Sequence, residues 1–355
     1  MIQLSSYITE AQVLMAQELI NQSNNVVILT HMSPDGDAMG SSLAIRHFLE
    51  AQGKQVNVIV PNAFPDFLAW LPKADLHIIY EKSKADADAI LEQAELIICT
   101  DFNDPKRIGS LGDKMLSLSC KKMMIDHHLH PADFPDLTIS YPACPSTCEL
   151  VYRLIRELQR SDLPSTGVAD LQRSDLTNIA TCIYTGMMTD TGNFSFSHLT
   201  PELYRSLAVL CATGINIPQI YNNVYNSFTE GRARLFGYTI NRKMKTLRKG
   251  TVAYMSLTED EMRRFWFQQG DSEGFVNYPL TVKKMRMSAI FIEHTDFIRV
   301  SLRSRGKVDV NVFAGRYFEG GGHKNAAGGK SYVSMEETIA RFEAAVEEYA
   351  KEGLL

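Results

Sequence analysis

The sequence lacks the features that mark several classes of non-globular or exported protein. No apolar run approaches the roughly 18 residues that a membrane-spanning helix needs. The first twenty residues contain neither a basic segment nor the unbroken apolar core of a secretory signal. With 22 Gly and 13 Pro among 355 residues and 45% apolar residues, collagen-like and disordered chains are excluded. We therefore expect a globular cytoplasmic protein without a membrane segment.

Paired cysteine motifs are also missing. None of the six cysteines belongs to a CxxC pair, and the CxxxC spacing of Cys144 and Cys148 has no second ligand pair to support a metal or redox site. We predict reduced, structural thiols.

The charges are distributed unevenly. The whole chain carries 36 Lys and Arg against 41 Asp and Glu, a net charge of −5, which by itself is weak evidence against a nucleic-acid partner. Residues 231–355, however, hold 21 basic and 15 acidic residues, a net of +6, which leaves −11 for residues 1–230. The length favours two domains, and the charge split indicates that they have different tasks.

Short apolar runs alternate with helix-length segments over the first 145 residues. The runs are apolar throughout rather than alternating, which is typical of strands buried on both faces of a parallel sheet. We predict an α/β fold with helices on both faces of this sheet. The predicted strands are 26–29, 56–60, 96–99 and 123–125, separated by helices such as 39–52 and 84–93.

The later part of the chain changes from helical to strand-rich. Helices are predicted at 147–160, 176–188 and over most of 201–248, followed by strands at 251–256, 286–293, 297–302 and 309–312 and a helix at 335–351. The predicted organisation is a first domain over 1–229, a helical connector over 230–246 and a smaller α/β domain with a mixed sheet over 247–355.

Residues able to bind metal ions follow three of the predicted strands. In an open parallel sheet, ligands collect beyond the carboxyl ends of the strands, so these residues should share one edge. Asp190, directly after another apolar stretch, is a fourth candidate. The strand-end candidates are His31, Asp35 and Asp37 after the first strand, Asp101 after the third, and Asp126, His127 and His128 after the strand at 123–125.

Each candidate also has a purely structural explanation. Asp37 could cap the next helix, Asp35 could form an Asx turn, Asp101 could start a turn, and either histidine of 127–128 could pack in the core. Together they are harder to explain, because clustered carboxylates repel one another and no Lys or Arg stands next to the aspartates. The set therefore predicts a cation site.

The ligand types indicate which cation is expected. Carboxylates and imidazoles without thiolates favour Mn²⁺ or Mg²⁺ over structural Zn²⁺, with Co²⁺ or Fe²⁺ as substitutes. The number of ligands exceeds what one ion needs and predicts two. Two ions a few ångström apart are the arrangement used for hydrolysis at phosphorus.

The candidate metal ligands at 31–37, 101, 126–128 and 190 resemble the four motifs of the DHH phosphoesterases, a family named for the triplet found here at 126–128. Further along, Ser301-Leu302-Arg303-Ser304 and Gly320-Gly321-Gly322-His323 resemble its DHHA1 domain. The resemblance covers nearly the whole chain with the motifs in order. It implies a metal-binding catalytic DHH domain, a substrate-binding DHHA1 domain, and an active site in the cleft between them.

The resemblance also implies a role for each residue. His31, Asp35 and Asp101 would hold one metal ion; Asp37, Asp101, His127 and Asp190 would hold the other. Asp126 would orient its histidine neighbours. His128 would lie near the scissile phosphate and stabilise charge or protonate the leaving oxygen. The two ions would activate a water for in-line attack on phosphorus.

The glycine run at 320–322 is the candidate phosphate-binding element of the second domain. Without Cβ atoms, its backbone N–H groups can approach a phosphate closely, although a tight turn is the alternative. It is not a Walker loop, because no Gly-Lys-Ser/Thr follows. Arg303 is the candidate for a bidentate phosphate contact, and the family resemblance supports both Arg303 and His323 in this role.

One residue departs from the family's glycine run. The family usually has a further glycine where this sequence has Glu319, and an acidic residue there could narrow a phosphate site. Gly321, Gly322 and His323 are therefore firmer candidates than Gly320.

Among the DHH phosphoesterases, a chain of this length resembles the nanoRNase/pAp phosphatase group. That group degrades very short oligoribonucleotides to mononucleotides and removes the 3′-phosphate of 3′-phosphoadenosine 5′-phosphate (pAp). The expected partners are short single-stranded RNA or small nucleotide phosphates, with a homodimer left open. Alternatives are a pApA or cyclic di-AMP phosphodiesterase and an exopolyphosphatase-like hydrolase; a non-catalytic nucleotide-binding protein is disfavoured because every metal-ligand position is present.

Overall fold

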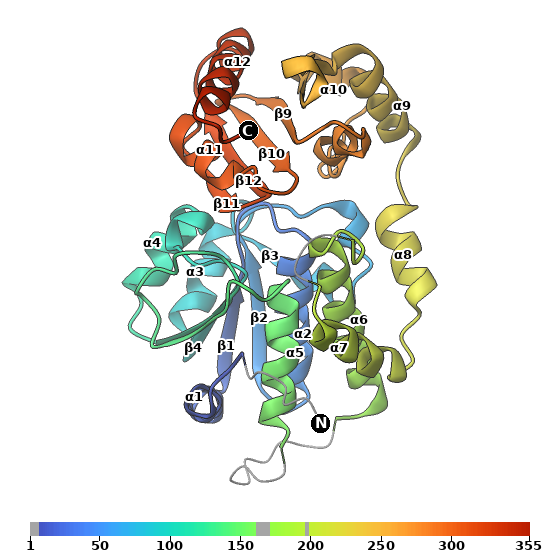
Figure 1. Ribbon diagram of the computed structural model, residues 1–355. Coiled ribbons are helices and arrows are strands. Elements are labelled where there is room, and N and C mark those ends of the chain that lie inside the picture. Colours follow the sequence, from blue (N-terminus) through green and yellow to red (C-terminus); the bar gives the residue numbers. More distant parts are fainter. Residues whose placement is uncertain (1–6, 161–170, 196–198) are drawn as a thin grey trace. The chain divides into compact units, whose positions relative to one another are not determined.

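The chain forms two compact units. The computed structural model describes residues 7–160, 171–195 and 199–355, and the boundary between the units falls between Ser227 and Phe228 (Figure 1). Residues 230–246, which we predicted as a connector, form α9 (Glu230–Tyr238), a π-helical turn (Thr239–Lys243) and the start of β7 (Lys245–Leu247) in the second unit. Leu235 of α9 lies in a core of that unit.

The first unit contains the predicted parallel sheet. Its strand order is β3-β2-β1-β4-β5-β6, and every neighbouring pair is parallel. The α/β prediction is thereby confirmed, although the two short edge strands β3 and β6 were not predicted. The strands are β1 Asn25–Leu29, β2 Gln55–Val60, β3 Ile78–Ile79, β4 Leu96–Thr100, β5 Lys121–Asp126 and β6 Leu137–Ser140.

Helices cover both faces of this sheet, as the continuous apolar runs predicted. In β1, Val26 and Ile28 enter a core with α1, α2, α5, α6 and α7, whereas Val27 and Leu29 enter another with α3 and α4. The helices are α1 Glu10–Asn21, α2 Gly36–Glu50, α3 Lys84–Glu92, α4 Ser110–Ser117, α5 Thr147–Leu158, α6 Arg173–Asp190, α7 Pro201–Ala212 and α8 Ile217–Tyr225.

Two glycines let α2, α5 and α6 pack closely. A Cβ atom on Gly40 would lie 2.5 Å from the carbonyl oxygen of Cys182, and one on Gly186 would overlap the Cys148 sulfur. Both positions therefore need glycine for close helix contact. This packing brings the C-terminal end of α6, which carries Asp190, next to the N-terminal ends of α2 and α5.

The second unit contains a mixed six-stranded sheet, again as predicted. The strand order is β11-β12-β10-β9-β8-β7; only the β8–β9 pair is parallel. One face packs on α11 (Val310–Tyr317) and α12 (Met335–Lys351), and the other on α9, α10 (Glu259–Arg264) and the 3₁₀ segment η6 (Phe275–Thr281). The remaining strands are β8 Val252–Leu257, β9 Met287–His294, β10 Phe297–Ser304, β11 Gly321–His323 and β12 Ala326–Ser331.

The predicted strand at 309–312 is wrong. Asp309 is the N-cap of α11, and its side chain accepts hydrogen bonds from the backbone N–H groups of Asn311 and Val312. The valines at 310 and 312 suggested a strand, but the capping aspartate and burial of Val310 in the core place these residues in a helix.

Among the described residues, no helix combines the length and apolar character needed to cross a membrane.

Candidate metal centre

The loop from β1 to α2 holds Asp35 and Asp37 in different ways. Asp35, not Asp37, is the N-cap of α2, and its Oδ1 accepts hydrogen bonds from the backbone N–H groups of Asp37 and Ala38 at 3.0 and 3.1 Å. Asp37, only 1% exposed, lies in the first turn of the helix. The predicted alternative, in which Asp37 caps α2, is therefore wrong, because Asp35 fills that position.

Two histidines present the same ring nitrogen to this cluster. The Nδ1 of His31 lies 2.9 Å from the Met32 carbonyl oxygen, and the Nδ1 of His127 lies 3.0 Å from that of Cys144. These contacts favour the tautomer in which Nδ1 carries the proton and donates it. Each Nε2 is then a lone-pair donor, the form in which histidine binds a metal.

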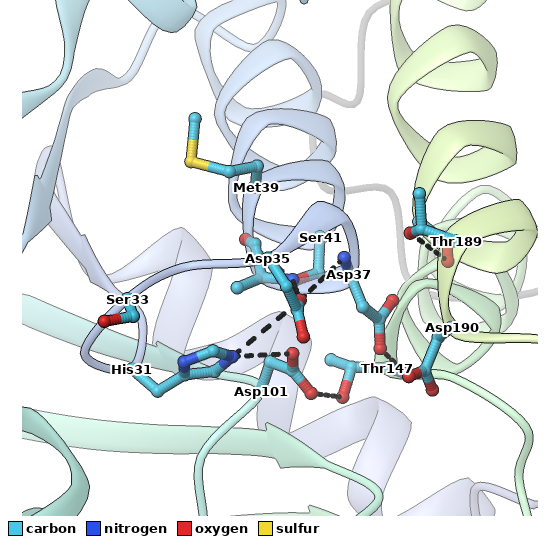
Figure 2. A network of polar contacts seen from close by, with 12 residues as sticks. His31, Ser33, Asp35, Asp37, Met39, Ser41, Asp101, Thr147, Thr189 and Asp190 are labelled. Carbon is cyan, nitrogen blue, oxygen red and sulfur yellow. Dashed lines mark hydrogen bonds and ion pairs between the residues drawn. The ribbon is translucent and has the colours of Figure 1, made fainter. Parts of the chain in front are cut away.

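The Nε2 atom of His31 faces Asp35 and Asp101 (Figure 2), and that of His127 faces three carboxylates. His31 Nε2 lies 3.4 Å from Asp101 Oδ2 and 3.8 Å from Asp35 Oδ1. His127 Nε2 lies 3.4 Å from Asp190 Oδ2 and 3.7 Å from Asp101 Oδ1, and also 3.8 Å from Asp37 Oδ2. The six predicted metal ligands are thus brought together, with Asp101 between the two histidines.

Asp101 follows β4 in an unusual backbone conformation. Its φ is +63°, in the left-handed region that non-glycine residues seldom adopt, although Asp tolerates it better than most. Its N–H still donates to the Ile125 carbonyl oxygen at 3.1 Å. Such local strain clusters at functional sites, and here it accompanies the carboxylate shared by both histidines.

The first turn of α5 holds two of the carboxylates, and our sequence analysis missed it. Asp37 accepts the backbone N–H groups of Thr147 and Cys148 at 2.6 and 2.9 Å, and the Thr147 hydroxyl donates to Asp101 Oδ1 at 2.8 Å. The sequence signal was a helix start, Ser146-x-x-Glu149, whose serine caps the Glu149 N–H. It predicts where a helix begins but not that this end faces Asp37 and Asp101.

Thr147→Val tests this support. Valine keeps the shape of threonine but removes the hydroxyl, so Asp101 loses a donor while the backbone bonds to Asp37 remain. We expect a 10- to 100-fold fall in metal affinity or activity, the usual loss for groups that support a metal ligand. Titration calorimetry with Mn²⁺ measures the affinity, and Thr147→Ser is the matched control that keeps the hydroxyl. Equal Mn²⁺ affinity in the valine and serine variants would show that the hydroxyl does not support Asp101.

Asp126 holds His128. The fully buried Asp126 accepts the backbone N–H of His128 at Oδ2 and lies against His128 Nδ1 at Oδ1, both at 2.7 Å. The imidazole is therefore fixed through its main chain and its ring, and its Nδ1 lies 3.8 Å from Asp101 Oδ1.

Three members of the cluster hold protons tightly, whereas two others release them: burial would raise the pKa of Asp35 but contact with His31 lowers it, and burial with Arg107 lowers that of His128. Burial, together with Asp101 and Asp190, raises the pKa of Asp37 well above its usual value. Burial alone would lower the pKa of both histidines, but nearby carboxylates outweigh it and raise the pKa of His31 to about 10 and that of His127 to about 9. A site that stabilises positive charge this strongly is suited to a cation.

The donor atoms fit divalent cations. His31, Asp35 and Asp101 each offer a ligand atom within 4.8 Å of the others, as do Asp37, Asp101 and His127. Only oxygen and imidazole donors are present in these groups, which suits Mn²⁺ or Mg²⁺. The nearby thiol of Cys148 is not a competing ligand, because burial raises its pKa well above the usual value and keeps it protonated.

The predicted phosphate-binding residues of the second unit share one face of its sheet. Arg303 on β10 and His323 on β11 both pair with Ala326 of β12. Directly paired residues of antiparallel strands point to the same face, so the two side chains flank a small alanine about 10 Å apart. This pairing is a feature of the fold that sequence spacing could not reveal.

The glycine run is close-packed. A Cβ atom on Gly320 would overlap the Gly328 carbonyl oxygen, and one on Gly322, where φ is +148°, would lie 2.6 Å from the Ala326 carbonyl oxygen. The Gly322 N–H donates to Asn311 Oδ1 at 2.8 Å. Glu319 is exposed and left-handed, with a φ of +48°, a conformation that explains a glycine preference there.

Known proteins resemble this chain in both units. Residues 25–187 match the DHH family, N-terminal domain, and residues 249–352 match the DHHA1 domain. The crystal structure of an exopolyphosphatase-related protein from Bacteroides fragilis is 44% identical, with a TM-score of 0.88 over 98% of each chain.

Two curated relatives align over most of this chain. The bifunctional oligoribonuclease and PAP phosphatase NrnA of Thermus thermophilus is 29% identical over 345 residues, which cover 96% of this chain and 95% of that protein. The cyclic-di-AMP phosphodiesterase GdpP of Bacillus subtilis is 25% identical over 351 residues, which cover 95% of this chain but 50% of GdpP. With both domains matched in order and a relative at 44% identity along its whole length, this chain belongs to the DHH family of phosphoesterases and carries a DHHA1 domain.

Proposed function

We propose that this chain hydrolyses short oligoribonucleotides to mononucleotides and removes the 3′-phosphate of pAp. The observation that carries the proposal is the buried carboxylate and imidazole cluster around Asp101, in which one residue serves two groups of ligand atoms. The alignment with NrnA along nearly all of both chains supports this substrate class over that of GdpP, only half of which is covered. As a DHH-family member the chain is a metal-dependent phosphoesterase.

Two Mn²⁺ ions are the proposed cofactors, with Mg²⁺ or Co²⁺ as alternatives. We assign His31, Asp35 and Asp101 to one ion; the ligands assigned to the other are Asp37, Asp101, His127 and Asp190. When bound, such a pair lowers the pKa of a water between the ions and offsets negative charge on the phosphate. Thr147 and the first turn of α5 keep Asp37 and Asp101 oriented for this task.

His128 is the proposed proton donor to the leaving oxygen. Asp126 holds its Nδ1 at 2.7 Å, so we assign the donating role to Nε2. Asp126 orients the ring, while burial and the nearby Arg107 guanidinium lower the pKa of His128 well below its usual value, so the ring, once protonated, gives up its proton readily. In the second unit, Arg303, His323 and the Gly321 N–H are proposed to hold a neighbouring phosphate. The N–H groups of Gly320 and Gly322 already donate to the Ala314 carbonyl oxygen and to Asn311 Oδ1, so we assign these two glycines to the close packing of the run.

A substrate panel tests the proposal. Turnover of an RNA dinucleotide, pAp, pApA, cyclic di-AMP, a five-nucleotide RNA and polyphosphate is measured with Mn²⁺ and with Mg²⁺. We expect mononucleotides from the dinucleotide and AMP from pAp, both lost in chelator. Preference for cyclic di-AMP or polyphosphate would replace the proposed substrate class, and full activity in chelator would refute the metal mechanism.

Arg303→Lys tests the phosphate contact. Lysine keeps the charge but cannot form the planar two-point contact of a guanidinium, so we expect KM to rise about tenfold with a smaller change in kcat. Steady-state kinetics on the RNA dinucleotide give both constants. The control is Arg341→Lys, an exposed position on α12, which covers the opposite face of the sheet. Unchanged KM in Arg303→Lys would remove Arg303 from the substrate site.

A further inference from the structure

Trp266 occupies a backbone position that normally favours glycine. It follows the end of α10, with its N–H donating to the Arg263 carbonyl oxygen and the next N–H, of Phe267, donating to Met262, each at 3.1 Å. This is the Schellman pattern, in which the first residue past the helix adopts a left-handed conformation. The φ of Trp266 is +52°, so a bulky side chain is held where its Cβ is unfavourable.

Burial does not compensate for this conformation. The Trp266 side chain is 73% exposed, more than any other large hydrophobic residue described. It therefore adds little to the core while it strains the backbone. A costly residue that does not stabilise its own fold indicates a role in contacts with another molecule.

The neighbours of Trp266 show which kind of molecule suits it. Arg263, Arg264, Gln268 and Gln269 are all exposed, and no acidic residue occurs between Met262 and Gly270. Arg263 lies 3.2 Å from Asp260, but both side chains are at least 75% exposed, so this pair is readily exchanged for a phosphate. An exposed indole beside guanidinium and amide groups can stack a base and bind phosphates of single-stranded RNA.

This segment lies on the sheet face that carries Arg303. Met262 of α10 packs with Ile290 and Ile292 of β9. Because Ile290 pairs with Ser301, two residues before Arg303 on β10, these side chains share a face. The order β9-β10-β12-β11 puts β9 about 14 Å from the glycine run. Arg303 lies on β10, next to β9, but Met262 packs near Ile292, which pairs with Arg299, about 13 Å along the strand from Arg303. A strand longer than a dinucleotide would reach from Arg303 and the glycine run to this segment.

We propose that Trp266 stacks a base of single-stranded RNA while Arg263 and Arg264 contact its phosphates, forming an outer subsite for substrates longer than a dinucleotide. This inference rests on the proposed function, because it assumes that RNA is the substrate. It adds a contact surface outside the metal centre.

Substitutions at Trp266 separate this role from a structural one. Trp266→Gly removes the ring and restores the residue that the backbone favours, so it should raise Tm by about 3 °C while weakening RNA binding at least fivefold. Trp266→Phe keeps a ring and should stay within about twofold of the parent. Tyr332→Ala removes another exposed aromatic, 63% exposed and without a left-handed backbone, and is the control.

Binding is measured by anisotropy with a labelled seven-nucleotide RNA in EDTA, where hydrolysis is suppressed. Because Trp70 is the other tryptophan, the Trp70→Phe protein reports Trp266 alone, and its fluorescence should be quenched by RNA. Turnover of the RNA dinucleotide with Mn²⁺ should be unchanged in every Trp266 variant.

The outcomes are distinguishable. Unchanged RNA affinity in Trp266→Gly overturns the inference. If light scattering then shows a dimer for the parent and a monomer for the variant, Trp266 contacts a second copy of the chain instead. If the parent protein fails to hydrolyse the dinucleotide, the proposed function fails, whereas the binding comparison still decides whether Trp266 contacts RNA.

Discussion

Asp101→Asn is expected to reduce phosphoester hydrolysis at least about 1,000-fold, because one substitution removes the shared ligand of both proposed metal ions. Its Oδ2 lies 3.4 Å from His31 Nε2 and its Oδ1 lies 3.7 Å from His127 Nε2. Asparagine has nearly the same shape but no negative charge. Titration calorimetry should therefore show fewer than two bound Mn²⁺ ions, and initial rates on the dinucleotide measure the loss of activity.

The control for this variant is Asp113→Asn, an exposed aspartate on α4. It should leave both activity and Mn²⁺ stoichiometry unchanged. Metal-free Asp101→Asn should melt cooperatively but below the Tm of the parent at pH 6.5, because the substitution removes a carboxylate that stabilises the protonated rings of His31 and His127. Activity above a tenth of the parental value, with two ions still bound, would exclude Asp101 as the shared ligand.

Metal removal is expected to make the stability of the protein strongly pH-dependent. The pKa of His31 is raised to about 10 and that of His127 to about 9, and burial beside Asp101 and Asp190 raises that of Asp37. A raised pKa means that the folded state binds protons more tightly than the unfolded state. The contribution of the two histidines to folding stability is therefore complete below about pH 6.5 and is lost as the pH rises through 9 to 10. The contribution of Asp37 to folding stability also falls as the pH rises, and this fall begins above the ordinary pKa of an aspartate.

Melting curves in EDTA at pH 6.5 and pH 9 measure this effect, and Tm should fall with rising pH. Metal ions compete with these protons, so the rise in Tm caused by Mg²⁺ should be larger at pH 9. At 100 times the dissociation constant, binding adds about 2.7 kcal/mol, or roughly 5–10 °C for a unit of this size. If the rise in Tm caused by Mg²⁺ were smaller at pH 9 than at pH 6.5, the assignment of His31, Asp37 and His127 as metal ligands would be contradicted.

The metal ligands could be predicted because the sheet topology converts sequence order into spatial proximity. Carboxyl ends of parallel strands meet at one edge, so the positions of His31, Asp101 and His127 at strand ends predict that they lie together. Asp190 could be named but not placed, because it ends a helix and reaches the cluster only through the glycine-mediated packing of α2 on α6.

Other contacts depended on tertiary structure from the start. The strand predicted at 309–312 failed because the preference of valine for strands is weak compared with helix capping and burial. Thr147 was missed because its hydroxyl acts on Asp101, 46 positions away.

The sequence by itself determined the α/β class, the mixed second sheet, the six candidate metal ligands and the uneven charge. Local propensity, strand-end position and residue chemistry are sufficient for these. The tertiary structure alone placed the first turn of α5 against two carboxylates, aligned Arg303 with His323 across β12, and exposed Trp266 in a left-handed conformation. Each of these depends on which segments pack together or on a single backbone angle, and sequence spacing carries no information about either.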